Sequence, residues 1–319
     1  MSYRKKVNLF LIGAPKAGTT SVAKFLDLSR EISVSKPKEP GYFAVDCGGN
    51  PDRNGYTPRN IDEYEDLWLG GSQCSAKYWC DASTNYSWCP GAIRKIKAYN
   101  ANAKCIYILR HPIEAAYSLY CEEKYQLNDP SLSFEDAWLS GSGQAASEDG
   151  FSRLNYGAIS SFGARCAELL ELFDRSNVHI CFLEDLVTDE WEFYSNLASF
   201  LGVKFDRNLI GIKENTRKVR VNVKLAKILL NPPSFISPLY VFLKVLLHKL
   251  GIRGVRSGLL NAFSTGLPVD ANPNFSAAFA RKLEDYFSND IEILSDLCGR
   301  DLAHWHRCPQ KFIRSGDLE

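Results

Sequence analysis

The sequence has almost no net charge. Its 38 lysines and arginines nearly balance 37 aspartates and glutamates, which gives a formal net charge of +1. Proteins that bind nucleic acids or anionic membranes over a broad surface usually carry a large basic excess. The balance therefore argues against a general nucleic-acid binder, and we expect no nucleic-acid partner. Any site for an anion must be local.

Long hydrophobic runs are also missing. After the basic start, only the six residues VNLFLI precede the first glycine and proline, which is too short for a secretory signal. The most apolar stretch, SFISPLYVFLKVLLHKL at 234–250, has seventeen residues and contains two lysines and a histidine. That length is marginal for a membrane span. We expect no transmembrane segment and interpret 234–250 as a buried or lid-forming amphipathic helix.

The ten cysteines show no paired short spacing of the kind that zinc ligands have. The three cysteines between residues 74 and 89 are spaced irregularly, and HWHRC at 304–308 is the other cluster that we considered. We expect no metal site. Cys105 and Cys181 lie in apolar runs, where a thiol behaves as a small hydrophobic group. With no secretory signal, this pattern indicates a reducing, cytoplasmic location.

Strand-like and helix-like segments alternate along the chain. Between the strand-like runs, apolar residues recur at steps of three and four, as in amphipathic helices. The predicted strands are 7–12, 32–35, 77–83, 104–109 and 178–183. Such alternation predicts a parallel sheet covered by helices on both faces. We therefore expect a single α/β domain over residues 5–306, with its ligand site beyond the carboxyl ends of the strands.

The stretch GAPKAGTT at 13–20 joins the first predicted strand to a helix. Backbone amides in such a turn, together with the helix N-terminus, form a local site for an anion. A Walker loop would have a lysine directly after its second glycine, but Thr19 stands there and Lys16 lies inside the turn. An ordinary strand-to-helix turn remains an alternative for this stretch alone.

A second motif, YILRHPIEAAYSLY at 107–120, follows the fourth predicted strand. Arg110 stands at the carboxyl end of that strand, and Ser118 lies eight residues further on. Taken alone, Arg110 could form a structural ion pair. Together with the loop at 13–20, however, the sequence resembles the sulfotransferases that use 3′-phosphoadenosine 5′-phosphosulfate (PAPS). The resemblance implies that the loop holds the 5′-phosphosulfate and that Arg110 and Ser118 hold the 3′-phosphate.

Three further motifs support the resemblance, at 38–43 (KEPGYF), 81–90 (DASTNYSWCP) and 283–305. The set is similar to bacterial relatives of the glycosaminoglycan-type sulfotransferases, whose fold is related to that of P-loop NTPases. Similarity covers residues 5–206 and 275–305.

Two departures from the family bear on the acceptor. Relatives that act on heparan chains carry a lysine where this sequence has Ala82. That difference argues against a highly anionic, heparan-like acceptor. The segment 207–274 matches the family weakly, and we expect it to select the acceptor and to form a lid over the site.

The resemblance implies PAPS as cofactor, PAP as product and no required metal. The residues implied in holding the phosphosulfate are Lys16, Ala17, Gly18, Thr19 and Thr20. A sulfuryl group carries less negative charge than a phosphoryl group, so backbone amides and one ammonium can suffice where kinases need magnesium. We expect Lys16 to stabilise the leaving phosphate oxygen.

The acceptor must lose a proton, so the reaction needs a base within hydrogen-bond reach. Glu39 follows the second predicted strand and therefore lies at the same sheet edge as Lys16; the resemblance assigns it the role of base. His111 is the rival, although a histidine in this position is more often a packing or capping residue. Tyr42, Tyr86 and His111 are candidate acceptor contacts.

The sequence thus predicts a PAPS-dependent sulfotransferase that moves a sulfuryl group in line to a hydroxyl, less often an amine. The acceptor is a small molecule or a saccharide, for example in natural product biosynthesis. One alternative is a P-loop nucleotide kinase or phosphotransferase. Another is a non-catalytic nucleotide-binding or membrane-surface protein. The sequence does not indicate an oligomeric state.

Overall fold

The computed structural model describes residues 5–47, 58–69, 75–126, 128–142, 154–205, 219–220, 264–265 and 273–314. Contacts between residues divide the chain into two units. The larger contains residues 1–120, 131–213 and 274–319, and the smaller contains residues 121–130 and 214–273. In the smaller unit, β6 (Val219–Arg220) pairs with β7 (Ser264–Thr265) in antiparallel fashion. Most of the predicted lid, including 234–250, lies outside the described residues, so its role stays a prediction.

The larger unit is built on a five-stranded parallel sheet with the order β2-β3-β1-β4-β5. The strands are β1 (Leu9–Gly13), β2 (Ile32–Val34), β3 (Tyr78–Asp81), β4 (Lys104–Leu109) and β5 (Val178–Phe182). Every residue of β1 and β3 is buried, as expected for central strands covered on both faces. The predicted α/β class and all five predicted strands are confirmed, with ends that differ by at most two residues.

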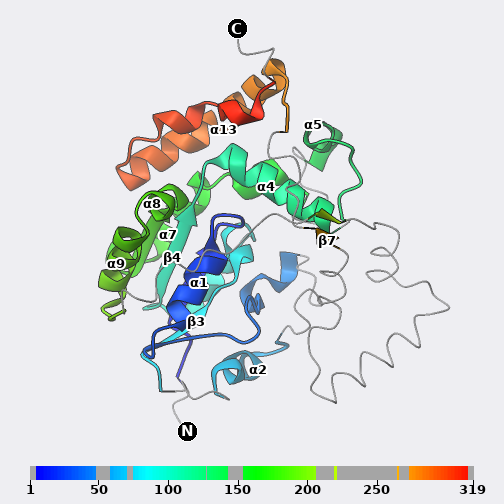
Figure 1. Ribbon diagram of the computed structural model, residues 1–319. Coiled ribbons are helices and arrows are strands. Elements are labelled where there is room, and N and C mark those ends of the chain that lie inside the picture. The colour runs from blue at the N-terminus through cyan, green and yellow to red at the C-terminus, as the bar shows by residue number, and fades with distance from the viewer. Residues whose placement is uncertain are drawn as a thin grey trace, which may run out of the picture. The chain divides into compact units, whose positions relative to one another are not determined.

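Helices connect the strands and flank the sheet (Figure 1). The α-helices of the larger unit are α1 (Thr19–Asp27), α2 (Ile61–Glu65), α3 (Ala92–Tyr99), α5 (Phe134–Ala137), α6 (Tyr156–Ser160), α7 (Gly163–Leu172), α8 (Leu183–Thr188), α9 (Glu190–Leu201) and α13 (Ala277–Cys298). Helix α4 (Pro112–Tyr125) begins in this unit. Short 3₁₀ and π turns are η1 (Tyr42–Cys47), η2 (Asp66–Trp68), η3 (Thr84–Ser87), η4 (Trp138–Ser142), η5 (Arg175–Asn177), η7 (Ala303–His306) and η8 (Gln310–Phe312).

Side-chain contacts identify which helices pack together. Phe25 of α1 stacks on Tyr194 of α9 with 3.7 Å between ring centroids. On α13, the Asp290 carboxylate accepts hydrogen bonds from the amides of Phe162 and Gly163 at the start of α7. A Cβ at Gly163 would lie 2.7 Å from an Asp290 oxygen, so this close approach requires glycine. Helices distant in sequence thus form one compact unit around the sheet.

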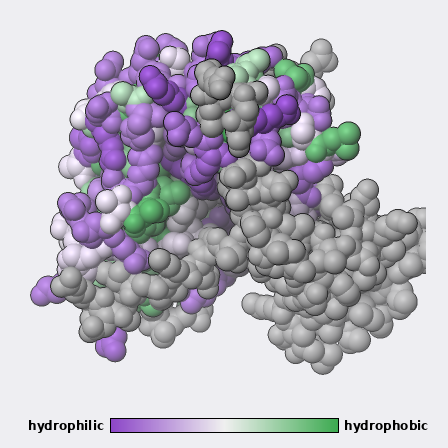
Figure 2. Space-filling model, turned by 45° about the horizontal axis from the view of Figure 1, so that its top comes forward, coloured by the Kyte–Doolittle hydropathy of each residue, from purple (hydrophilic) through white to green (hydrophobic). Residues whose placement is uncertain are grey.

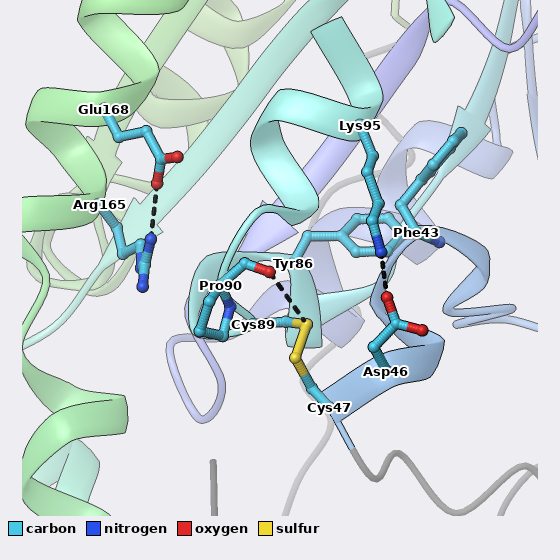
Figure 3. Close-up of a disulfide and its surroundings, with 9 residues drawn as sticks. All are labelled: Phe43, Asp46, Cys47, Tyr86, Cys89, Pro90, Lys95, Arg165 and Glu168. Carbon is cyan, nitrogen blue, oxygen red and sulfur yellow. Dashed lines mark hydrogen bonds and ion pairs between the residues drawn. A yellow bond between two sulfur atoms is a disulfide. The ribbon is translucent and has the colours of Figure 1, made fainter. Parts of the chain in front are cut away.

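One disulfide joins Cys47 at the end of η1 to Cys89 after η3, with 5.7 Å between their Cα atoms (Figure 3). The sequence interpretation, which treated the cysteines as belonging to a reducing environment, did not anticipate this bond. Cys105 and Cys181 are buried thiols as predicted, and burial raises the pKa of Cys105 to about 12. The cytoplasmic location stays a prediction.

The surface seen in Figure 2 is mostly hydrophilic where the chain is described, with small separate hydrophobic areas. Within the described residues, no helix combines the length and the apolar character that crossing a membrane requires. The same part of the chain contains no group of three or more histidine, cysteine, aspartate or glutamate side chains arranged to hold a metal ion.

Candidate functional site

The turn between β1 and α1 has the backbone shape of an anion site. Lys16 and Gly18 both have positive φ, 65° and 87°, and Gly18 is the N-cap of α1. The turn is closed by a hydrogen bond from the Ala17 amide to the Ala14 carbonyl, 3.2 Å long. The amides of Gly18 and Thr19 make no hydrogen bond to any described residue. Unpaired amides at a helix N-terminus are suited to bind a phosphate or sulfate.

Gly18 cannot be replaced easily. Its left-handed conformation disfavours any residue with a side chain, and a Cβ there would lie 2.9 Å from Cδ1 of Leu183 in α8. Helix α8 therefore packs directly against the turn. This contact helps to fix the shape of the turn.

Arg110 connects the two motifs that the sequence singled out. It directly follows the last residue of β4, and its Nη1 donates a hydrogen bond of 3.0 Å to the carbonyl of Lys16. Nε and Nη2 donate to one oxygen of Glu114, at 3.1 and 2.8 Å. The arginine thus lies against the turn between β1 and α1, and its guanidinium is held by the Lys16 carbonyl and by the Glu114 carboxylate. The structure brings together Lys16 and Arg110, which are 94 positions apart in the sequence.

Ser118 lies on α4 and is buried, with 7% of its surface exposed. It is four residues after Glu114, so the two side chains share one face of the helix. Arg110 binds Glu114 and therefore lies toward this same face. The arrangement is consistent with Arg110 and Ser118 contributing to one site.

Glu114 is the partner that fixes Arg110, and the sequence analysis did not identify it. Burial raises the pKa of this carboxyl, but the charge of Arg110 and hydrogen bonds from Lys311 and Arg110 outweigh that effect. The resulting pKa is about 2, compared with an ordinary value of 4.5. Glu114 is consequently ionised near neutral pH and holds the arginine through a charge-assisted pair.

The lowered pKa of Glu114 predicts a pH-dependent contribution to stability. A carboxyl with a depressed folded-state pKa stabilises the protein above its unfolded pKa and loses that effect as pH falls toward the folded value. We expect Glu114→Gln to destabilise the protein at pH 6, and the difference from wild type to shrink by about 1 kcal/mol at pH 3.5. Urea denaturation at both pH values measures it. A difference that stays constant would contradict the ion-pair explanation.

Glu39 lies on the loop after β2, so it shares the carboxyl edge of the sheet with Lys16, which follows β1. Strand β3 lies between β1 and β2. Lys38 forms an ion pair with the Glu39 carboxylate. Glu39 has φ of 60°, a left-handed conformation that is unusual for a residue other than glycine. Glu39 is about one third exposed, which leaves its carboxylate accessible to a substrate.

The predicted acceptor residues have different surroundings. The ring of Tyr42 stacks on Tyr64 at 4.8 Å, and Tyr42 lines a surface groove together with Val45, Arg59 and Lys95. Tyr86 is fully buried, and its hydroxyl donates to a buried carboxylate. Tyr42 is therefore at a surface that a ligand can reach, whereas Tyr86 belongs to the protein core.

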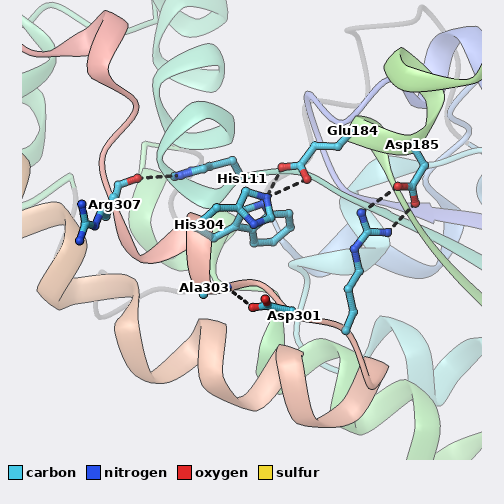
Figure 4. Close-up of polar contacts among 9 residues, drawn as sticks. His111, Glu184, Asp185, Asp301, Ala303, His304 and Arg307 are labelled. Carbon is cyan, nitrogen blue, oxygen red and sulfur yellow. Dashed lines mark hydrogen bonds and ion pairs between the residues drawn. The ribbon is translucent and has the colours of Figure 1, made fainter.

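His111 faces the C-terminal segment. Its Nε2 lies 3.0 Å from the carbonyl of Arg307, and its ring is 5.9 Å from that of Trp305 (Figure 4). The side chain is 7% exposed, and burial lowers its pKa. These contacts agree with a packing role at the start of α4. Its role as an acceptor contact or as the base stays a prediction.

The C-terminal segment supports the turn between β1 and α1 through helix α8. Arg300 forms two hydrogen bonds, 2.6 and 2.8 Å long, with the carboxylate of Asp185 in α8 (Figure 4). Glu184, the preceding residue, accepts one hydrogen bond from the indole Nε1 of Trp305 and pairs with His304. Helix α8 is thereby held in place next to Gly18. These long-range contacts give no signal in the local sequence pattern.

Comparison with known proteins places the chain among sulfotransferases. The family described as "Sulfotransferase domain" matches residues 90–286, more than half of the chain. Bifunctional heparan sulfate N-deacetylase/N-sulfotransferase 3 of Mus musculus is 29% identical over 124 residues, which are 39% of this chain and 14% of that protein. The corresponding enzyme 1 of Xenopus laevis is 27% identical over 116 residues, which are 36% of this chain and 13% of that protein. The matches thus span a small part of these relatives' own length.

A crystal structure of a sulfotransferase from Alicyclobacillus acidocaldarius has the same fold. It aligns with a TM-score of 0.67 at 21% sequence identity, covering 95% of this chain and 100% of that one. The family match and the shared fold together support a sulfotransferase enzyme, and the chain belongs to the sulfotransferase domain family.

Proposed function

We propose that the protein is a PAPS-dependent sulfotransferase acting on a hydroxyl group. In this proposal the turn at residues 16–20 binds the 5′-phosphosulfate through the unpaired amides of Gly18 and Thr19 and through the Lys16 ammonium, and Arg110 and Ser118 bind the 3′-phosphate. The observation that carries the proposal is the hydrogen bond from Arg110 to the Lys16 carbonyl. This bond holds Arg110, which precedes the buried Ser118 by eight residues, against the turn that contains the unpaired amides of Gly18 and Thr19. A nucleotide with phosphates on both the 3′ and 5′ positions matches such a pair of anion sites.

The chemistry assigned to this chain needs two protein groups. Glu39 accepts the proton of the acceptor hydroxyl while the acceptor oxygen attacks sulfur and the bond from sulfur to the phosphate oxygen breaks. Lys16 stabilises the negative charge that develops on that leaving oxygen. The products are the sulfated acceptor and PAP. The amides of the turn supply the remaining charge stabilisation, so the proposal requires no metal.

The acceptor in this proposal is a small molecule or saccharide rather than a highly sulfated chain. Ala82, which replaces the lysine of heparan-acting relatives, is completely buried. The exposed groove beside Tyr42 is lined by apolar and aromatic side chains together with Arg59 and Lys95. An acceptor with an apolar body would suit this surface.

Mass spectrometry tests the proposal directly. The protein is incubated with PAPS and a panel of hydroxylated and amino-group acceptors, with and without a metal chelator. We expect an acceptor to gain the mass of one SO₃ group, PAP to be released in equal amount, and the chelator to have no effect. Phosphate transfer from ATP with magnesium, and no sulfated product, would instead support a P-loop phosphotransferase.

Arg110→Ala is expected to weaken binding of PAP by about tenfold to a hundredfold, because a charge-assisted hydrogen bond contributes roughly 1.5–3 kcal/mol. Binding of AMP, which lacks the 3′-phosphate, should change much less. Calorimetry with both nucleotides measures this difference. Arg94→Ala is the control, since Arg94 is an exposed arginine paired with Glu168. If Arg110→Ala weakens PAP and AMP equally, Arg110 only supports the loop at Lys16.

A further inference from the structure

Asp81, the last residue of β3, is a completely buried carboxylate. Its oxygens accept hydrogen bonds from the hydroxyls of Ser83, at 2.5 Å, and of Tyr64 and Tyr86, each at 2.7 Å. Burial raises the pKa of Asp81, and the three hydrogen bonds partly offset this effect. Placing a carboxyl group in the core is costly unless it has such partners. A group of this kind requires an explanation beyond packing.

Two of the three hydroxyls also bind the segment that carries Glu39. Ser83 Oγ accepts a hydrogen bond of 2.9 Å from the amide of Gly41. Tyr86 OH accepts a longer one, 3.5 Å, from the amide of Phe43, and the two side chains lie close together in Figure 3. Asp81 is therefore connected to the main chain of this segment through Ser83 and Tyr86. For Tyr64, the described structure shows no such bond to the segment.

The main chain around Glu39 requires an anchor. Glu39 and Gly41 both have φ in the left-handed region, 60° and 65°, with Pro40 between them. A non-glycine residue in this region is strained, so neighbouring contacts must maintain its conformation. Because the proline ring fixes φ of Pro40, a change of backbone direction at Gly41 is passed on to Glu39. The Ser83 contact to the Gly41 amide is placed where it controls this direction.

We propose that Asp81 is a positioning residue for the catalytic base: through Ser83 it fixes the backbone at Gly41 and thereby directs the Glu39 carboxylate toward the acceptor. The inference rests on the proposed function, in which Glu39 is the base. Asp81 itself touches neither PAPS nor acceptor. Its position at the carboxyl end of β3, between the strands that precede Lys16 and Glu39, suits this role.

The segment has other contacts, which should keep it folded when the Ser83 hydroxyl is removed. The disulfide between Cys47 and Cys89 holds the far end of η1, and Tyr42 stacks on Tyr64. Loss of the Ser83 hydroxyl should consequently leave η1 attached while freeing the turn at Gly41. Asp81→Asn could fail to fold, because it alters a buried group with three partners. Ser83→Ala is therefore the main variant.

The matched control is Tyr64→Phe. It removes a hydroxyl that binds the same carboxylate but has no described hydrogen bond to the Glu39 segment. We expect Ser83→Ala to lower kcat by about tenfold to a hundredfold, since a displaced catalytic group loses this much. The KM for PAPS and the affinity for PAP should not change. Tyr64→Phe should keep kcat within about threefold of wild type, although each variant loses one hydrogen bond to Asp81.

Combination with Glu39→Gln distinguishes positioning from a general structural defect. If Ser83 acts through the base, Ser83→Ala causes no further loss of kcat in a Glu39→Gln background. Equal effects of Ser83→Ala in both backgrounds would overturn the inference. So would equal losses of kcat in Ser83→Ala and Tyr64→Phe.

Amide hydrogen exchange supplies a readout that does not depend on activity. Ser83→Ala should increase exchange at residues 39–43, and Tyr64→Phe should not. If the wild type is active and Ser83→Ala changes neither kcat nor amide exchange, the inference about Asp81 is overturned while the proposed function stands. A wild type that transfers no sulfuryl group to any acceptor, but shows the expected change in exchange, overturns the proposed function while supporting the Ser83 anchor.

Discussion

Replacing Glu39 with glutamine is expected to lower kcat by about 10²- to 10⁴-fold. Glutamine keeps the shape of the side chain but cannot accept the proton of the acceptor hydroxyl. The affinity for PAP should remain nearly unchanged, because Glu39 follows β2 whereas the proposed nucleotide contacts follow β1 and β4. Single-turnover measurement of sulfated product gives the chemical step directly, and calorimetry gives the affinity.

Asp46→Asn is a suitable control for this experiment. Asp46 is an exposed carboxylate on the same segment of the chain, where it pairs with Lys95 (Figure 3). Its replacement should leave kcat near the wild-type value. If Glu39→Gln keeps wild-type turnover at saturating acceptor, under conditions where chemistry limits the rate, Glu39 is not the base. His111 would be the next candidate, despite its burial and its contact with Arg307.

The strands of this fold could be predicted because each carries its own signal. β4 and β1 are short apolar runs that end abruptly in arginine or glycine, and the helices between strands repeat apolar residues at three- and four-residue steps. In a parallel sheet these features also identify the edge at which the loops collect. Lys16 and Arg110 both follow strands that end at this edge, and the structure joins them by a direct hydrogen bond.

Other parts of the site depend on contacts that leave no local pattern. The Cys47–Cys89 disulfide joins residues 42 positions apart, and the Ser83–Gly41 hydrogen bond spans the same distance. Neither residue of such a pair indicates its partner through spacing or periodicity. Asp81 offered one usable signal, an acidic residue at the end of the apolar run KYWCD, since a buried carboxylate needs donors nearby.

In helix α4, one residue of the site, Glu114, could not be recognised from the sequence. The sequence indicated Arg110 before the helix and Ser118 within it, but did not single out Glu114. An acidic residue in the first turn of a helix is common because it complements the helix dipole, so its presence says little. Only the structure shows that Glu114 binds Arg110 and also pairs with Lys311 from the C-terminal segment.

Lys16→Met is expected to lower kcat by about 10²- to 10³-fold, as is typical for the loss of one group that stabilises charge developing in a transition state. Methionine has a similar length and removes only the ammonium. In the proposed reaction the leaving phosphate oxygen gains negative charge as its bond to sulfur breaks, so Lys16 should matter more for the chemical step than for binding PAPS. Lys36→Met is the control, because Lys36 is 79% exposed and pairs with Asp27.

The ratio between the losses in turnover and in affinity determines which role Lys16 has. An interaction made equally with the bound substrate and the transition state changes KM and leaves kcat alone. We therefore expect single-turnover rates of Lys16→Met to fall far more than its affinity for PAPS, and Lys16→Arg, which restores a positive charge, to recover part of the rate. If PAPS binding weakens a hundredfold while the rate at saturation is unchanged, Lys16 only holds the phosphosulfate. Charge stabilisation at the leaving oxygen would then have to come from the amides of the turn that Gly18 shapes.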